Sequence, residues 1–118
     1  MLHILQSAPP SASDAALRAM FAARKSVFVD LLKWDVPVLE GRYEVDQFDD
    51  LNATYLILAE PDGAHLGSVR LLPTMRPHIL GNLYPGLCED APPRAPDIFE
   101  ITRFCLDRRL RAAERRAV

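Results

Sequence analysis

Apolar residues recur at helical spacing between residues 17 and 31. The stripe consists of Leu17, Met20, Phe21, Val27, Phe28 and Leu31. Ser11 or Ser13 can cap the start of this helix, and Asp14 falls in its first turn, where a negative charge suits the helix dipole. A short strand is predicted before it at residues 3–6.

Arg24 lies inside the apolar stripe, three residues after Phe21 and four before Phe28. Arg18 and Lys25, in contrast, mark the polar face of the helix. An unpaired buried charge is very costly, so the Arg24 guanidinium must either reach solvent or meet an anion. A structural ion pair with an aspartate is one alternative, and a ligand anion is the other.

Residues 34–37 end the helix, and residues 38–42 are predicted to be irregular. This segment begins with the only tryptophan, Trp34, which either covers a ligand or packs against the core. Residues 53–60 are too continuously apolar for a one-sided strand and predict a central strand that is buried on both faces. After a turn at 61–63, residues 65–74 form the returning strand of a hairpin.

In that returning strand Ser68, Arg70 and Leu72 share one face, so Arg70 also needs a partner. Residues 77–96 form a long loop with one helical turn at 78–83, and either a functional lid or disorder accounts for its length.

The last predicted strand spans residues 97–106, and the chain is predicted to be helical from residue 107. Glu100 and Arg103 are three residues apart, so a regular strand would place them on opposite faces; a β-bulge would bring both into one cleft. The order of elements predicts a single α/β domain over residues 1–118, with a mixed, largely antiparallel sheet and flanking helices.

The 118 residues have a net charge of −2 and a hydrophobic content of 49%, as in an ordinary globular domain without the positive excess that nucleic-acid binding needs. No apolar run approaches the ~18–20 residues that cross a membrane, and no secretion signal is recognisable, so a cytoplasmic protein is expected. Cys88 and Cys105 lack disulfide or metal spacing, and Cys105 is predicted to pack in a strand.

Familiar catalytic motifs are absent. The sequence contains no phosphate-binding loop, no dinucleotide-binding glycine pattern and no nucleophile elbow. His3, His65 and His78 lack metal-like spacing, and no metal site is predicted. Ser68 would need a neighbouring base to act as a nucleophile, and the sequence identifies none.

The candidate chemistry centres on residues 44–50, which place four carboxylates within seven residues: Glu44, Asp46, Asp49 and Asp50. Acidic loops are often only solvated. Here, however, Arg24, Arg70, Glu100 and Arg103 lie on or next to predicted core elements. Such a set suits a zwitterionic substrate with a reactive amine, since carboxylates hold cations, an arginine holds a carboxylate, and one carboxylate remains to accept a proton.

Several runs of residues resemble one family when they are taken in order. They are Arg24-x-x-x-Phe28, Trp34, Glu44-x-Asp46-x-x-Asp49, Gly67-Ser68-x-Arg70-Leu71-x-Pro73-Thr74 and Glu100-x-Thr102-Arg103-Phe104. Together they cover residues 24–106 and resemble the acyl-homoserine-lactone synthases, the bacterial autoinducer synthases. The resemblance implies an acetyltransferase-like α/β fold. It also implies transfer of an acyl chain from acyl carrier protein or coenzyme A to the amine of S-adenosylmethionine, which is a substrate rather than a cofactor.

The same resemblance implies roles for individual residues. Arg24, Phe28, Trp34, Asp46, Asp49 and Arg70 would bind S-adenosylmethionine or brace its site through ion pairs. Glu100 or Glu44 would be the base, and Arg103 would shape the catalytic site. Ser68, Thr102 and Phe104 would line the acyl path.

The family commonly extends well past this length, so a chain shortened at its C-terminal end is expected. The arginines at positions 108, 109, 111, 115 and 116 would then dock an acidic carrier protein, or simply form a solvated face. Two other functions stay open. One is an N-acyltransferase that acts on a different amine, and the other is a shortened protein that binds S-adenosylmethionine without turnover.

Overall fold

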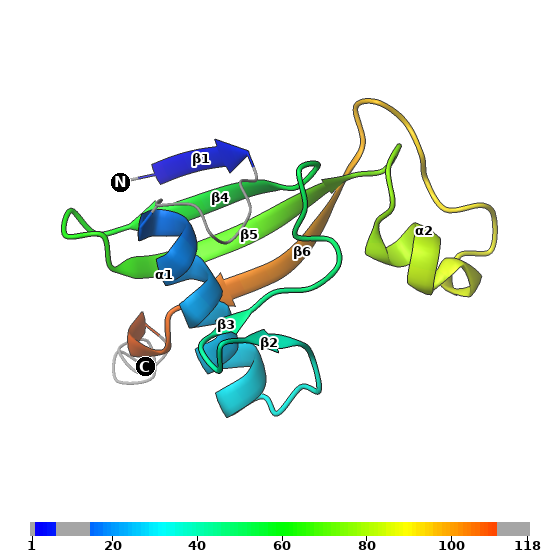
Figure 1. Ribbon diagram of the computed structural model, residues 1–118. Helices are drawn as coiled ribbons and strands as arrows, with labels where there is room; N and C mark the ends of the chain where they lie inside the picture. The colour runs from blue at the N-terminus through cyan, green and yellow to red at the C-terminus, as the bar shows by residue number, and fades with distance from the viewer. Residues whose placement is uncertain (1, 7–14, 111–118) are drawn as a thin grey trace, which may run out of the picture.

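A four-stranded antiparallel sheet frames the computed structural model, which describes residues 2–6 and 15–110 (Figure 1). Its strands, in spatial order, are β1 (Leu2–Gln6), β4 (Thr54–Ala59), β5 (His65–Pro73) and β6 (Phe99–Leu106). Adjacent strands pair antiparallel throughout. The predicted strands are therefore confirmed to within two residues at each end, and so is the α/β class.

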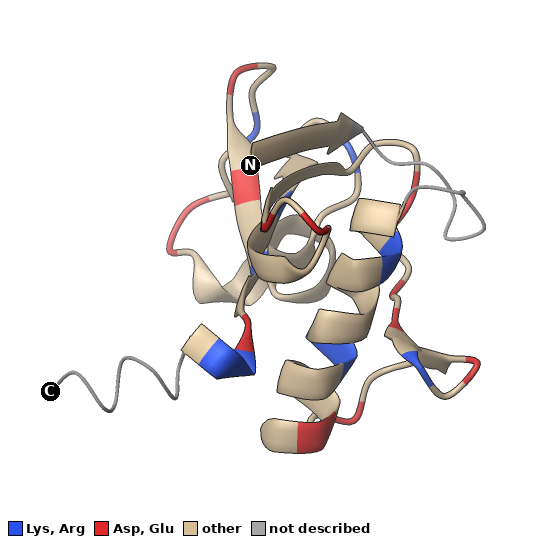
Figure 2. Ribbon diagram, turned by 90° about the vertical axis from the view of Figure 1, so that its left-hand side faces the viewer, with Lys and Arg blue, Asp and Glu red and all other residues tan. Residues whose placement is uncertain are grey.

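One helix covers a single face of this sheet (Figures 1 and 2). It consists of α1 (Ala15–Arg24), which continues directly into the π-helical segment η1 (Lys25–Leu31). Its apolar residues form the core with residues of β4 and β5, and the main members are Leu17, Met20, Phe21, Tyr55, Ile57 and Leu72. The predicted capping residues Ser11, Ser13 and Asp14 lie outside the described part of the chain.

The prediction that Leu31 belongs to the buried stripe is wrong, because its side chain is 39% exposed. In a π-helix each hydrogen bond spans five residues, so side chains after residue 25 no longer follow the α-helical spacing. The helix ends at Leu31, and Lys33, just beyond it, has a φ of 60°. The Trp34 N–H donates to the Phe28 carbonyl at 2.8 Å, and this reversal stacks the two rings with centroids 4.6 Å apart.

Residues 38–44 form a small hairpin, whereas residues 38–42 were predicted to be irregular. Strand β2 (Val38–Leu39) pairs with β3 (Tyr43–Glu44), and the turn places Glu40 and Gly41 at φ of 55° and 68°. Two-residue strands carry too little alternation to be recognised in a sequence. Because β3 packs against α1, the hairpin brings Glu44 to the buried side of the helix.

Residues 53–60 form an interior strand, as predicted, because β4 lies between β1 and β5, but the expected burial on both faces is wrong. Tyr55 and Ile57 are buried toward the helix, but Leu58, on the opposite face, is 46% exposed. Leu2, Ile4 and Phe104 are exposed as well. No described helix covers this second face of the sheet.

The long connection between β5 and β6 is ordered into two short helical elements, α2 (Ile79–Leu83) and η2 (Pro85–Leu87), and α2 confirms the predicted turn. Thr74 closes the base of this connection, since its buried hydroxyl lies 2.8 Å from the Ile98 carbonyl and accepts the Ala95 N–H at 3.0 Å. Within the described ranges, no helix is both long and apolar enough to cross a membrane.

Candidate functional site

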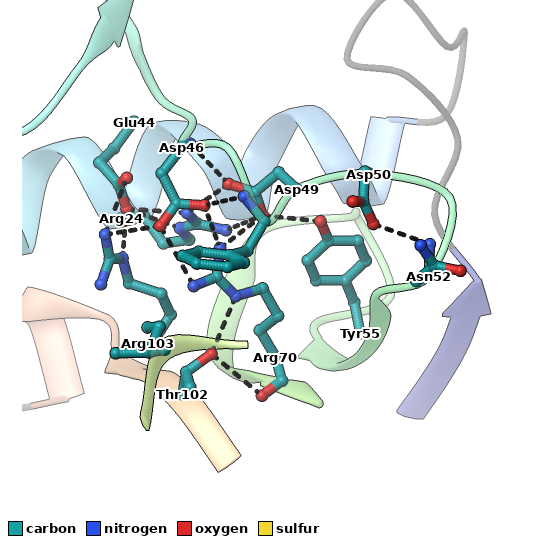
Figure 3. Close-up of polar contacts among 12 residues, drawn as sticks. Arg24, Glu44, Asp46, Asp49, Asp50, Asn52, Tyr55, Arg70, Thr102 and Arg103 are labelled. Carbon is teal, nitrogen blue, oxygen red and sulfur yellow. Dashed lines mark hydrogen bonds and ion pairs between the residues drawn. The ribbon is translucent and has the colours of Figure 1, made fainter. Parts of the chain in front are cut away.

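Three arginines and three carboxylates from distant parts of the chain meet between the helix and the sheet (Figure 3). We call this set the charge cluster, and it consists of Arg24, Glu44, Asp46, Asp49, Arg70 and Arg103. The arginines come from α1, β5 and β6, whereas the carboxylates come from β3 and the loop that follows it. All six were predicted as site residues. Asp50 does not belong to the cluster, because its side chain instead accepts the Asn52 N–H at 2.9 Å.

Arg24 is completely buried and pairs with two carboxylates. Its Nη1 and Nη2 donate to the two Asp49 oxygens, each at 2.9 Å, and its Nε donates to Glu44 Oε1 at 2.9 Å. Burial alone would lower the pKa of Arg24, but Asp49 and Glu44 outweigh it and hold the pKa above its usual value. The sequence left open whether Arg24 reaches solvent or meets an anion, and the structure pairs it with carboxylates.

Asp49 is the carboxylate that both buried arginines share. In addition to Arg24, its Oδ1 lies 3.1 Å from Arg70 Nη1 and accepts the Tyr55 hydroxyl at 2.7 Å. Burial would raise the pKa of Asp49, yet the hydrogen bonds and charge of Arg24, together with Arg70, hold it well below its usual range. Burial and the neighbouring Asp49 raise the pKa of the Tyr55 hydroxyl, so Tyr55 acts here as a hydrogen-bond donor.

Arg70 links the loop after β3 to the sheet. Its Nη1 and Nη2 donate to the two Asp46 oxygens at 2.6 and 3.2 Å, and its Nε donates to Thr102 Oγ1 at 2.8 Å. The loop itself is preorganised, because the Asp46 N–H donates to Asp49 Oδ2 and the Phe48 N–H donates to Asp46 Oδ1, both at 2.8 Å.

Arg103 enters the cluster through a β-bulge in β6. The pairing with β5 shifts between Thr102 and Cys105, and Arg103 has a φ of 49°. The predicted bulge is therefore present, but it includes Arg103 itself rather than lying before it. Arg103 Nε donates to Glu44 Oε1 at 2.9 Å and Nη2 to Asp46 Oδ2 at 3.1 Å.

The Arg103 guanidinium also lies over two aromatic rings, 5.7 Å from the Phe28 centroid and 5.4 Å from that of Trp34. Cation–π contacts of this kind join the charge cluster to the stacked Phe28 and Trp34 side chains.

A cavity of about 430 Å³ adjoins the cluster and falls within the size range of small-molecule sites. Its lining combines the exposed ends of the cluster with aromatic and apolar side chains, and the residues are Trp34, Val36, Pro37, Asp46, Gln47, Phe48, Ile79, Leu83, Tyr84 and Arg103. Asp46 has a side-chain exposure of 14%, whereas those of Glu44 and Asp49 are 0%. Asp46 is thus the carboxylate of the cluster that a ligand can reach.

The three carboxylates and three guanidinium groups of the charge cluster balance in formal charge. One oxygen from each of Glu44, Asp46 and Asp49 lies within 4.8 Å of the others, a spacing that could hold a cation. Their oxygens, however, already accept hydrogen bonds from Arg24, Arg70 and Arg103, so the arginines act as the counter-ions.

Glu100 lies outside the charge cluster. Its Oε1 accepts the Ile79 N–H at 2.9 Å and its Oε2 accepts the Leu80 N–H at 2.7 Å. Both amides belong to the first turn of α2, whose Ile79 and Leu83 line the cavity. The structure therefore places the two predicted base candidates differently, with Glu44 enclosed by two arginines and Glu100 beside the cavity wall.

Of the three residues assigned to the acyl path, Ser68 and Phe104 line the same shallow apolar groove, and Thr102 does not. Ser68 is buried, and its Oγ lies 2.8 Å from His65 Nε2; burial lowers the pKa of that histidine. Thr102 bonds to Arg70. Phe104 lies on the other face of the sheet, in that groove with Leu56 and Leu58.

Sequence reasoning missed Tyr55, Ile79 of α2 and Tyr84, which follows α2. Tyr55 carries the one phenol in an apolar strand, and a buried hydroxyl needs a partner, which was a usable signal. Ile79 and Tyr84 gave no signal, because their contribution depends on how the long connection folds. Among the C-terminal arginines, Arg108 and Arg109 are exposed, and Arg109 Nε donates to Asp107 at 3.0 Å; those at 111, 115 and 116 lie outside the described residues.

Residues 10–118 match the family model described as autoinducer synthase. The chain is 40% identical over 97 residues to an acyl-homoserine-lactone synthase of Ralstonia nicotianae, which covers 80% of this chain and 46% of that protein. It is 38% identical over 97 residues to an acyl-homoserine-lactone synthase of Pseudomonas fluorescens, covering 80% of this chain and 50% of that protein. The chain thus spans about half the length of the curated relatives it matches.

Solved structures with the same fold come from proteins of this kind. BjaI, described as a CoA-dependent acyl-homoserine lactone synthase with SAM and isopentyl-CoA, superposes with a TM-score of 0.82 at 29% identity, over 94% of this chain and 53% of that one. TofI, in a ternary complex with an inhibitor and MTA, gives a TM-score of 0.72 at 30% identity, over 89% of this chain and 56% of that one.

Proposed function

The chain belongs to the autoinducer synthase family, and from that premise we propose that it catalyses the synthesis of an acyl-homoserine lactone. The substrates are S-adenosylmethionine and an acyl thioester, carried by acyl carrier protein or coenzyme A. The product would serve as a quorum-sensing signal. The cytoplasmic location expected from the sequence stays a prediction.

The observation that carries the proposal is the position of Asp46. It is fixed by Arg70 and Arg103, yet part of its carboxylate faces the cavity of about 430 Å³. S-adenosylmethionine carries a sulfonium and an ammonium, so a fixed carboxylate beside an aromatic wall complements its charge. Asp46 would contact the cationic part of the substrate. The buried Glu44 and Asp49 would brace the site through their ion pairs.

The reaction has two parts. In the first, the amine nitrogen of S-adenosylmethionine attacks the thioester carbonyl; an amide bond forms, the carbon–sulfur bond breaks, and the thiol leaves. A base must take a proton from the attacking amine. Glu100 is the better-placed of the two candidates, since each carboxylate oxygen retains a second lone pair beyond its bond to a backbone amide. Glu44 is enclosed by arginines.

In the second part, the carboxylate of the methionine moiety attacks its own γ-carbon. The carbon–sulfur bond breaks, methylthioadenosine leaves and the lactone ring closes. This step depends mainly on positioning, because the sulfonium is already a good leaving group. The fixed contacts of Arg103 with Trp34 and Phe28 would hold that side of the site rigid.

Product analysis by mass spectrometry tests the proposal. The chain is incubated with S-adenosylmethionine and either an acyl carrier protein pool or acyl-coenzyme A, and the mixture is searched for acyl-homoserine lactone and methylthioadenosine. Both products are expected from one of the two donors, and the mass of the lactone gives the acyl length. Binding of S-adenosylmethionine without either product would favour the non-catalytic alternative, and no binding would favour an acyltransferase for another amine.

A further inference from the structure

We propose that Glu100 is a positioning residue that holds α2 in place as one wall of the ligand cavity, and that this tether sets the affinity for S-adenosylmethionine. The inference rests on the proposed function for its ligand, but the tether itself is a property of the chain alone. This positioning role of Glu100 is separate from any proton transfer.

The tether consists of two hydrogen bonds from one carboxylate. Glu100 Oε1 and Oε2 accept the N–H groups of Ile79 and Leu80 at 2.9 and 2.7 Å. The first amides of a helix have no partner within the helix, and a carboxylate is the strongest acceptor they can find. The residue that precedes α2, His78, provides no side-chain cap for this turn. Glu100 therefore supplies, from β6, the contact that the local sequence does not.

The helix that Glu100 contacts, α2, is not stable on its own. Helix α2 has five residues, far fewer than an isolated helix needs to be stable in water. Only Ile79 packs against the core, while Leu83 and the following Tyr84 are exposed apart from their part in the cavity. Loss of the carboxylate would therefore free the first turn of α2 and, with it, the part of the cavity wall that Ile79 and Leu83 supply.

Two variants at Ile79 distinguish the effect of losing the backbone hydrogen bond from the effect of losing the isoleucine side chain. Ile79→Pro removes the N–H that donates to Glu100, and Ile79→Ala keeps it. Proline is tolerated at the first position of a helix. The preceding His78 has φ of −147° and ψ of 168°, the extended conformation that proline requires before it.

If the tether sets affinity, Ile79→Pro raises the KM for S-adenosylmethionine at least about threefold above that of Ile79→Ala, with a smaller change in kcat. Equal KM values for the two variants would overturn the proposal. If Ile79→Pro only unfolded part of the protein, the amount of active enzyme and therefore the apparent kcat would fall, but the KM values of the two variants would stay equal.

Amide hydrogen exchange of the ligand-free chain provides the second measurement and needs no turnover. In Glu100→Gln one of the two acceptor oxygens becomes an NH₂ group, so exchange at Ile79 or Leu80 is expected to be at least about tenfold faster, with β4 amides unchanged. Unchanged exchange at both residues would overturn the tether. Absence of turnover in the unaltered chain would overturn the proposed function instead, and the exchange rates alone would then decide on the tether.

Discussion

Arg24 and Asp49 face each other through two parallel hydrogen bonds of 2.9 Å, although 25 residues separate them in the chain (Figure 3). The side chains are 1% and 0% exposed. This pair joins the helix to the loop that carries Asp46. The position of the accessible carboxylate therefore depends on an ion pair that is itself shielded from solvent.

The first prediction concerns stability. Arg24→Ala leaves Asp49 and Glu44 buried with one counter-ion fewer each, and removal of one partner of a buried pair costs about 3–5 kcal/mol. Lys25→Ala is the matched control, because Lys25 is the next residue of the same helix and its pair with Asp30 is partly exposed; that change is expected to cost less than about 1 kcal/mol. Chemical unfolding measures both, and similar losses in the two variants would contradict the account.

The second prediction concerns acid. Arg24 and Arg70 outweigh burial and hold the pKa of Asp49 below its usual value, so the folded chain binds a proton at this site less readily than the unfolded chain does. The stabilisation is therefore complete above the usual pKa of an aspartate and is lost as the pH falls toward the depressed folded value.

Free energies of unfolding measured between pH 7 and pH 3 test whether Asp49 stabilises the fold more at neutral pH than in acid. Asp49→Asn is expected to be less stable at pH 7 but to lose less stability on acidification than the unaltered chain. The exposed Asp35, changed to Asn, serves as the control. Curves of equal steepness for the unaltered chain and Asp49→Asn would show that Asp49 does not have the depressed pKa.

Much of this site was visible in the sequence because charged residues stood where a core would reject them. Arg24 within an apolar stripe and Arg70 on a central strand each demanded a counter-ion, and both have one. A bulge near Arg103 was foreseeable from the spacing of Glu100 and Arg103, but it includes Arg103 instead of lying between the two residues, and only Arg103 lines the cavity. Misplaced charge is a stronger signal than hydrophobic periodicity alone.

Other features depend on tertiary context. The π-helical turn that exposes Leu31 has no local signature, and the small hairpin that delivers Glu44 is held by packing against α1. The contact between Glu100 and α2 could not be predicted from the sequence, because it depends on how the connection between β5 and β6 folds. The arginines were expected to brace the acidic segment through ion pairs, but the sequence could not show which arginine pairs with which carboxylate.

The third prediction separates the two glutamates. Glu100→Gln is expected to lower kcat by about 10²–10⁴ if Glu100 is the base. Glu44→Gln is expected to destabilise the fold, because Glu44 accepts hydrogen bonds from both Arg24 and Arg103. Turnover and unfolding are measured for both variants. If Glu100→Gln retains turnover and Glu44→Gln loses it at unchanged stability, the assignment is reversed.

The fourth prediction concerns the donor. If the arginines after β6 dock an acidic carrier protein, Arg108→Ala together with Arg109→Ala raises the KM for carrier protein and weakens its dependence on salt. Both residues are exposed. The KM for S-adenosylmethionine in the same variant is the internal control. A KM for carrier protein that neither rises nor changes with salt would leave these arginines as a solvated surface.

The most direct measurement is calorimetric titration of S-adenosylmethionine into the unaltered chain and into Asp46→Asn. Binding to one site is expected for the unaltered chain, with an affinity at least about tenfold lower in the variant, since a charge-assisted contact is lost. No heat of binding to the unaltered chain, or equal affinities for the two proteins, would contradict the claim that the braced carboxylate of Asp46 holds the cationic substrate.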